Sequence, residues 1–165
     1  MGLDACVYCD CVEKGNLRTP PPYAGLVFVE EDGCPELHSD NIEYSIEFDQ
    51  WRYRNPCVHN DLCLLHHRLG NMSAISRIRW VVQQITPEPE TAFPLLWSRV
   101  IYNGTHAGDF LTPEEAITLG EEIQRLLASD LKTHTAEHKN FFNAFLQMLA
   151  ELVEASRLVN KPISF

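Results

Sequence analysis

A group of cysteine and histidine residues lies between residues 57 and 67. It reads Cys57-x-His59-x3-Cys63-x2-His66-His67 and supplies thiol and imidazole groups, which are the side chains that zinc binds most often. Because a tetrahedral zinc needs four ligands, we consider Cys57, His59, Cys63 and His66 as one candidate set. The usual pair of cysteines two to four residues apart is absent, so the alternative is that these are buried thiols and ordinary imidazoles. Zinc is therefore a possible cofactor and the second of our hypotheses.

Three more cysteines stand near the start of the chain. Residues 3–11 alternate between two sides, which predicts a half-buried strand. Side chains of a strand point to opposite faces in turn, so Cys6 is expected to point away from Cys9 and Cys11, and one ion cannot gather all three. The first residues do not resemble a secretion signal. We therefore expect six reduced thiols in a cytoplasmic protein.

A histidine and an aspartate occur together in His106-Ala107-Gly108-Asp109, just before a predicted helix. Such a pair can serve in acid–base catalysis, but Asp109 can equally organise a turn by accepting backbone hydrogen bonds. The chain contains no nucleophile-elbow, phosphate-loop or dinucleotide-binding motif. We therefore predict that it is not an enzyme, and a hydrolase using His106 and Asp109 is our third hypothesis.

The whole chain has a formal net charge of −10, and acidic residues outnumber basic ones most strongly in residues 1–70, by 12 to 5. No lysine or arginine occurs between Arg18 and Arg52. The acids that we expect to attract a partner are Glu30, Glu31, Asp32, Asp40, Glu43 and Glu47. Trp51, Tyr53 and Arg54 follow them and are residue types enriched at binding hot spots, although Trp51 can instead belong to the core. This charge repels nucleic acid and attracts a basic protein, or it simply keeps the chain soluble.

The periodicity of the apolar residues predicts one α+β domain over residues 1–165, with a small antiparallel sheet from the N-terminal part and three to five helices. We expect strands over 3–11, 25–30 and 35–38, the last two joined at Asp32-Gly33. Residues 40–53 fit a strand by alternation and a helix by the Asp40–Glu43 capping box; we prefer the helix. Further helices are predicted over residues 71–85, 93–103, 112–129 and 137–158.

The connections between these elements also follow from the sequence. The most reliable helix start is Thr112-Pro113-Glu114-Glu115, which combines an N-cap, a proline and a capping-box glutamate. Residues 104–111 are predicted to form a loop, and residues 162–165 are a candidate terminal strand. No apolar run approaches the roughly 20 residues that cross a membrane.

Several short segments resemble a loose group of small bacterial proteins. They are the start Met1–Asp4, the segment 93–104, the capped helix from Thr112 to Leu127, and the closing residues 160–165. Some members of that group are uncharacterised, and others are immunity proteins that neutralise polymorphic toxins. The resemblance covers the start and the C-terminal part but not residues 12–70. It implies a cytoplasmic protein that binds a toxin directly, which is our first hypothesis. It implies no catalytic residue.

Overall fold

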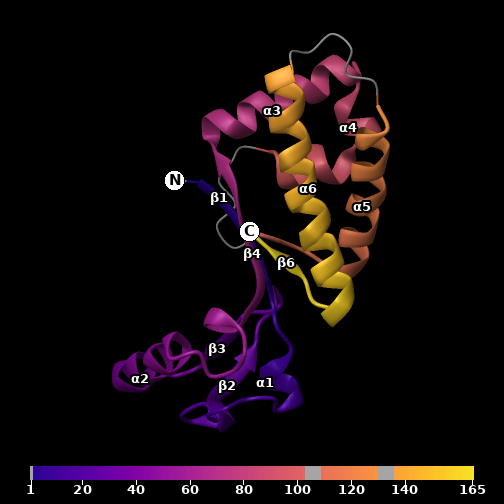
Figure 1. Ribbon diagram of the computed structural model, residues 1–165. Coiled ribbons are helices and arrows are strands. Elements are labelled where there is room, and N and C mark those ends of the chain that lie inside the picture. Colours follow the sequence, from indigo (N-terminus) through magenta and orange to yellow (C-terminus); the bar gives the residue numbers. More distant parts are fainter. Residues whose placement is uncertain (1, 103–108, 130–135) are drawn as a thin grey trace.

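The fold is built on a four-stranded antiparallel sheet with the strand order β4-β1-β6-β5. A computed structural model describes residues 2–102, 109–129 and 136–165 (Figure 1). The strands are β1 (Gly2–Tyr8), β4 (Cys63–Asn71), β5 (Phe110–Leu111) and β6 (Ile163–Ser164). The predicted α+β class is confirmed. The sheet does not come from the N-terminal part alone, because β5 and β6 belong to the second half of the chain.

Strand β1 shows the predicted alternation, since Leu3, Ala5 and Val7 are buried on one face. The strand ends at Tyr8 and not at residue 11 as predicted. The backbone leaves the extended conformation at Asp10, with φ −95° and ψ 16°, and the short helix α1 (Cys11–Lys14) begins directly after it. Cys9 and Cys11 therefore lie beyond the sheet.

Helices form a body on one side of the sheet (Figure 1). They are α3 (Met72–Ile85), α4 (Pro89–Ala92), the π-helical turn η3 (Leu96–Val100), α5 (Pro113–Leu127) and α6 (Ala136–Val159). Their apolar sides and the buried face of β1 form the large core. The predicted capping box of α5 is confirmed, since Thr112 Oγ1 accepts the backbone N–H of Glu115, and the Glu115 carboxylate accepts that of Thr112.

The helix predicted over residues 93–103 is shorter: helical residues run from 94 to 100 and end in η3, and the short helix α4 before them lies outside the predicted range. Phe93 precedes Pro94, and a residue before proline avoids the helical region; Phe93 has φ −140° and ψ 63°. The buried carboxylate of Glu122 accepts the N–H groups of Leu95 and Leu96 at 3.0 and 2.8 Å, which satisfies the start of the helical segment 94–100. The prediction of a loop over residues 104–111 is wrong at residues 110–111, which form the strand β5. Residues 104–108 of that predicted loop lie outside the described residues.

A smaller lobe continues from the lower ends of β1 and β4 (Figure 1). It contains α1, η1 (Ala24–Leu26), the hairpin β2 (Val27–Val29) and β3 (Pro35–Leu37), α2 (Ile42–Tyr53) and η2 (Asn60–Leu62). The predicted hairpin and the preferred helix are confirmed. The helix begins at Ile42 because the N-cap is Asn41 and not Asp40 as predicted: the Asn41 Oδ1 accepts the Glu43 N–H.

The lobe has a small core of its own, which contains Cys9, Cys11, Phe48, Trp51, Cys57 and Leu62. It is tied to the C-terminal tail by a Lys161–Glu13 ion pair and by the Ser164 hydroxyl, which donates to Asp32 Oδ2 at 3.1 Å. Half of the residues in this core are cysteines, so the lobe has few large apolar side chains to hold it together. Within the described ranges, no helix has the length and apolar character needed to cross a membrane.

Candidate metal centre

Four side chains with metal-binding atoms converge in the core of the small lobe. Their ligand atoms, from Cys9, Cys11, Cys57 and His59, all lie within 4.8 Å of one another. The Cys9 and Cys57 sulfurs are 3.8 Å apart, and His59 Nδ1 lies 3.5 Å from the Cys11 sulfur and 3.6 Å from the Cys57 sulfur. The three cysteines are buried and His59 is half-buried. This cluster can hold a metal ion.

Three of the separations among these atoms match edges of a tetrahedron around zinc. Zinc–sulfur bonds of about 2.3 Å and a zinc–nitrogen bond of about 2.05 Å give a sulfur–sulfur edge of about 3.8 Å and a sulfur–nitrogen edge of about 3.6 Å. The three distances in the protein agree with these edges to within about 0.1 Å. Three of the six edges therefore fit a four-coordinate zinc ion, and all four ligand atoms lie within 4.8 Å of one another.

Two short segments supply two ligands each, and both have one residue between the ligands. Cys9 and Cys11 flank the turn at the end of β1, and the Cys9 N–H donates to the Leu62 carbonyl at 2.7 Å. In the other segment, the backbone N–H of His59 donates to the Cys57 sulfur at 3.3 Å. Such N–H groups stabilise a thiolate, which is the form of cysteine that binds a metal.

The backbone is strained directly after the second segment. Leu62, which is fully buried, has φ +58°, and Asp61 has φ +50°. Residues other than glycine rarely adopt this region, and each instance costs on the order of 1–3 kcal/mol. The surrounding structure must hold the turn in place. A bound ion that fixes Cys57 and His59 would provide part of that restraint.

Burial makes the thiols difficult to ionise without a metal. Desolvation raises the pKa of the Cys9 thiol above its ordinary value, although the backbone N–H of Cys11 opposes this rise. Burial is also the main cause that raises the pKa of the Cys11 thiol. A metal ion would replace the thiol protons, and its bonds to the sulfur atoms would offset the cost of burying the thiolate charges.

Of the predicted ligand set, Cys57 and His59 belong to the cluster, whereas Cys63 and His66 do not. Cys63 begins β4, and its thiol donates to the Leu65 carbonyl at 3.1 Å. His66 stands opposite Cys6 on the exposed part of the same strand. The prediction grouped residues that are close in sequence. Cys63 and His66 lie in the extended strand β4, which leads away from Cys57 and His59. The matching Cys9-x-Cys11 and Cys57-x-His59 spacings were the usable signal.

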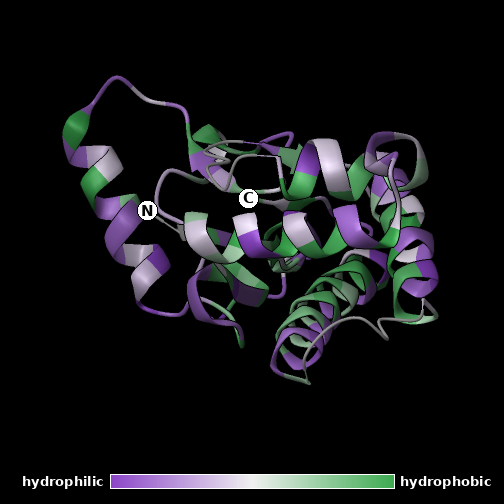
Figure 2. Cartoon of the chain, turned by 90° about the horizontal axis from the view of Figure 1, so that it is seen from above, coloured by the Kyte–Doolittle hydropathy of each residue, from purple (hydrophilic) through white to green (hydrophobic). Residues whose placement is uncertain are grey.

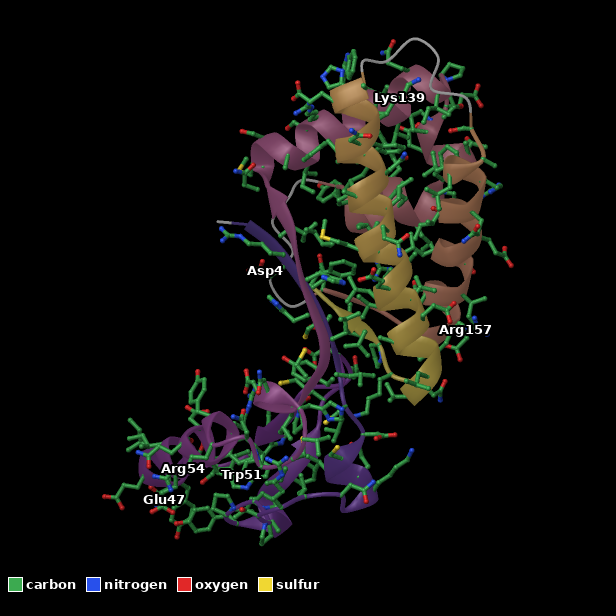
Figure 3. All side chains as sticks on the ribbon, in the orientation of Figure 1. Asp4, Glu47, Trp51, Arg54, Lys139 and Arg157 are labelled. Carbon is green, nitrogen blue, oxygen red and sulfur yellow. The ribbon has the colours of Figure 1, made fainter. Side chains whose placement is uncertain are left out.

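Three of the predicted partner-binding residues meet at a groove beside α2. Glu47, Trp51 and Arg54 line it together with the proline-rich segment 19–22, and its volume is about 490 Å³ (Figure 3). Trp51 is 6% exposed and its Nε1 donates to the Thr19 carbonyl at 2.9 Å, so it belongs to the lobe core as well. Tyr53 is exposed on the helix surface.

The other predicted acids are spread over the lobe. Asp32 organises the hairpin turn, because its Oδ1 accepts the Cys34 N–H at 2.8 Å while Oδ2 accepts from the tail. Glu30 pairs with His38 across the hairpin. Glu31, Asp40 and Glu43 are exposed.

The third hypothesis depends on His106, which lies outside the described residues. Asp109 is exposed, and its carbonyl accepts the backbone N–H of Phe165 at 2.9 Å, which joins it to the C-terminal tail. The structure therefore gives no geometry for an acid–base pair at these two positions.

Comparison with known protein families, curated proteins and solved structures gave no match to this chain. The resemblance to bacterial immunity proteins stays a prediction. Among the described residues, the cluster of Cys9, Cys11, Cys57 and His59 is the most specific functional feature.

Proposed function

We propose that the protein binds one zinc ion through Cys9, Cys11, Cys57 and His59, and that this ion holds the small lobe in a fixed shape for binding another protein. The observation that carries the zinc assignment is the convergence of four ligand atoms within 4.8 Å of one another, with three of their separations equal to tetrahedral zinc edges. Three thiolates and one imidazole are a donor set that favours zinc over magnesium or calcium.

The role proposed for the ion is structural. Four protein ligands complete the coordination of zinc and leave no open position for water or substrate. The cluster also replaces the apolar side chains that a lobe of this size needs in its core. Zinc binding thus supplies folding free energy to the part of the chain between the two strands β1 and β4.

The role proposed for the lobe is to bind a protein partner of basic character. Exposed acids, among them Glu31, Asp40 and Glu43, give the lobe a negative surface, which speeds encounter with a positive partner. Neutralisation of a toxin by direct binding is the particular case that the sequence resemblance implies. A reducing compartment such as the cytoplasm suits this proposal, because the thiolates must stay reduced to bind the ion.

Native mass spectrometry with elemental analysis tests the zinc assignment. The protein purified under reducing conditions is expected to carry one zinc per chain, which a strong chelator removes and added zinc restores. A reduced, folded chain that neither retains nor takes up zinc would contradict the assignment.

The partner role is tested by purifying the protein from its own host cells. We expect a basic protein to co-purify, with an affinity that falls as salt increases. Reversing the charges of Glu31, Asp40 and Glu43 together should weaken this complex and flatten its salt dependence. An unchanged affinity and salt dependence would rule out binding through the acidic face.

A further inference from the structure

Helix α2 carries apolar side chains on two opposite sides. Phe48 and Trp51 are buried in the lobe, whereas Ile42, Ile46 and Tyr53 are 74%, 50% and 76% exposed. Residues four or seven positions apart lie on the same side of a helix, so these three form one stripe. The stripe follows the helix for about 16 Å. We call it the outer stripe of α2.

The outer stripe lies on the part of the molecule that stands furthest from the helical body (Figure 1). In the view from above, α2 is the helix at the left edge, and hydrophobic positions alternate with hydrophilic ones along it (Figure 2). An isolated exposed apolar residue is common on any protein surface. Three of them aligned on one helix, next to acidic residues, have the form of a contact surface.

The charges beside the outer stripe are negative. Glu43, Glu47 and Asp49 are exposed on α2. The basic residue of the helix, Arg52, is half-buried, and its Nε lies 3.2 Å from Asp61 Oδ1, so its charge is directed into the lobe. Arg54, directly after the helix, is exposed and lines the groove beside α2. The surface therefore combines an apolar stripe with acidic borders.

The groove beside α2 provides a binding pocket for one large side chain of a partner. Pro20, Pro22, Pro56 and the Trp51 ring give it apolar walls, and Glu47 stands at its border with the helix surface. Its wall is fixed in advance by the hydrogen bond from Trp51 to the Thr19 carbonyl. A preformed groove lowers the entropy cost of binding.

The charges decide between the possible occupants of this surface. A second copy of the chain, docked by symmetry through the same stripe, would place acids against acids. A nucleic acid would bring phosphates to the same negative surface. A helix with one apolar side and lysine or arginine on its borders matches both the stripe and the acids.

We propose that the outer stripe of α2 and the groove beside it dock a cationic amphipathic helix of a partner protein. Ile42, Ile46 and Tyr53 contact its apolar side, and Glu43 and Asp49, which flank the stripe, face its basic side chains. One large apolar residue of the partner enters the groove. This inference rests on the protein-binding role proposed for the small lobe, and it specifies the partner by its chemistry.

The test uses a synthetic helical peptide of leucine and lysine with all leucines on one side, and a scrambled peptide of the same composition. Fluorescence anisotropy with the zinc-loaded protein is expected to show at least tenfold tighter binding of the amphipathic peptide. The double variant Ile42→Ser/Ile46→Ser should lose at least tenfold in affinity. The matched control is Ile117→Ser/Leu158→Ser, which removes exposed apolar residues from α5 and α6 and should bind as the unaltered protein does.

A second variant separates charge from apolar contact. Glu43→Gln/Asp49→Gln should weaken binding and reduce its dependence on salt. Equal loss in the stripe and control variants, or equal binding of the scrambled peptide, overturns the proposal.

Zinc content and circular dichroism are measured on every sample, which keeps the two proposals apart. A folded, zinc-loaded protein that does not bind the amphipathic peptide refutes the docking site and leaves the zinc site intact. A zinc-free protein that binds the peptide through the outer stripe refutes the zinc site and leaves the docking site intact.

Discussion

Replacing single cysteines by serine distinguishes the structural cluster from the set suggested by sequence spacing. Cys9→Ser removes one of the four converging ligands, whereas Cys63→Ser removes a thiol that only the spacing argument placed at the metal. Both positions border the same two strands, and both substitutions keep nearly the same side-chain size. The pair is therefore a matched comparison in which only one member is expected to affect zinc binding.

The expected loss follows from the geometry of the site. Structural zinc binds with an apparent free energy of about 10–16 kcal/mol at neutral pH, and the ligand spacing here requires little rearrangement. One ligand of four then contributes about 3 kcal/mol, which corresponds to a loss of affinity of about 100-fold to 1,000-fold. Cys63→Ser is expected to change the affinity by less than about threefold, which is under 1 kcal/mol.

The assay is a competition between the protein and a chromophoric chelator of known zinc affinity, under reducing conditions. Substitution with cobalt gives a second readout, because thiolate-to-cobalt charge-transfer absorption scales with the number of sulfur ligands. Cys9→Ser should reduce this absorption by about one third of the three-sulfur signal, in line with a Cys₃His site. If Cys63→Ser weakens zinc binding as much as Cys9→Ser does, the assignment of the cluster is incorrect.

Three further predictions concern the rest of the fold. Glu122→Ala leaves the N–H groups of Leu95 and Leu96 without an acceptor. It should lower the free energy of unfolding by about 3 kcal/mol and Tm by about 6–12 °C in thermal unfolding. Glu122→Gln keeps one acceptor oxygen and should cost less. Thr112→Ala removes the helix cap and should cost about 1 kcal/mol in denaturant unfolding; an unchanged midpoint would show that the cap contributes nothing. The hydrogen bond to Glu47 raises the pKa of Tyr23 to about 12. Glu47→Gln should therefore lower the Tyr23 pKa towards its ordinary value in an ultraviolet pH titration. An unchanged titration curve would contradict the contact.

Local sequence signals predicted most of the helices and the hairpin. The capping box at Thr112 fixed the start of α5 because a cap depends on residues within four positions of it. The preference for a helix over 40–53 was correct, since polar side chains before Ile42 satisfy the first N–H groups. The alternation of Leu3, Ala5 and Val7 placed one face of β1 in the core.

Features that depend on distant residues were not predictable in the same way. The start of the helical segment 94–100 is satisfied by Glu122, which lies 26 positions from Leu96, and no local pattern shows that contact. The strand β4 was missed because its apolar residues do not alternate regularly with polar ones. Its pairing with β1 is a contact between residues about 60 positions apart, which no local pattern encodes.

The sequence by itself determined the supply of thiol and imidazole groups, the fold class and the acidic character of the small lobe, because these follow from composition and from short-range periodicity. Only the tertiary structure decided which ligands meet. The ladder between β1 and β4 brings the end of one strand next to the residues that precede the other, so Cys9 and Cys11 reach Cys57 and His59. The same ladder uses Cys63 as a strand residue. Ligand geometry is a property of the pairing of strands, and that pairing is set by the burial of a whole sheet face.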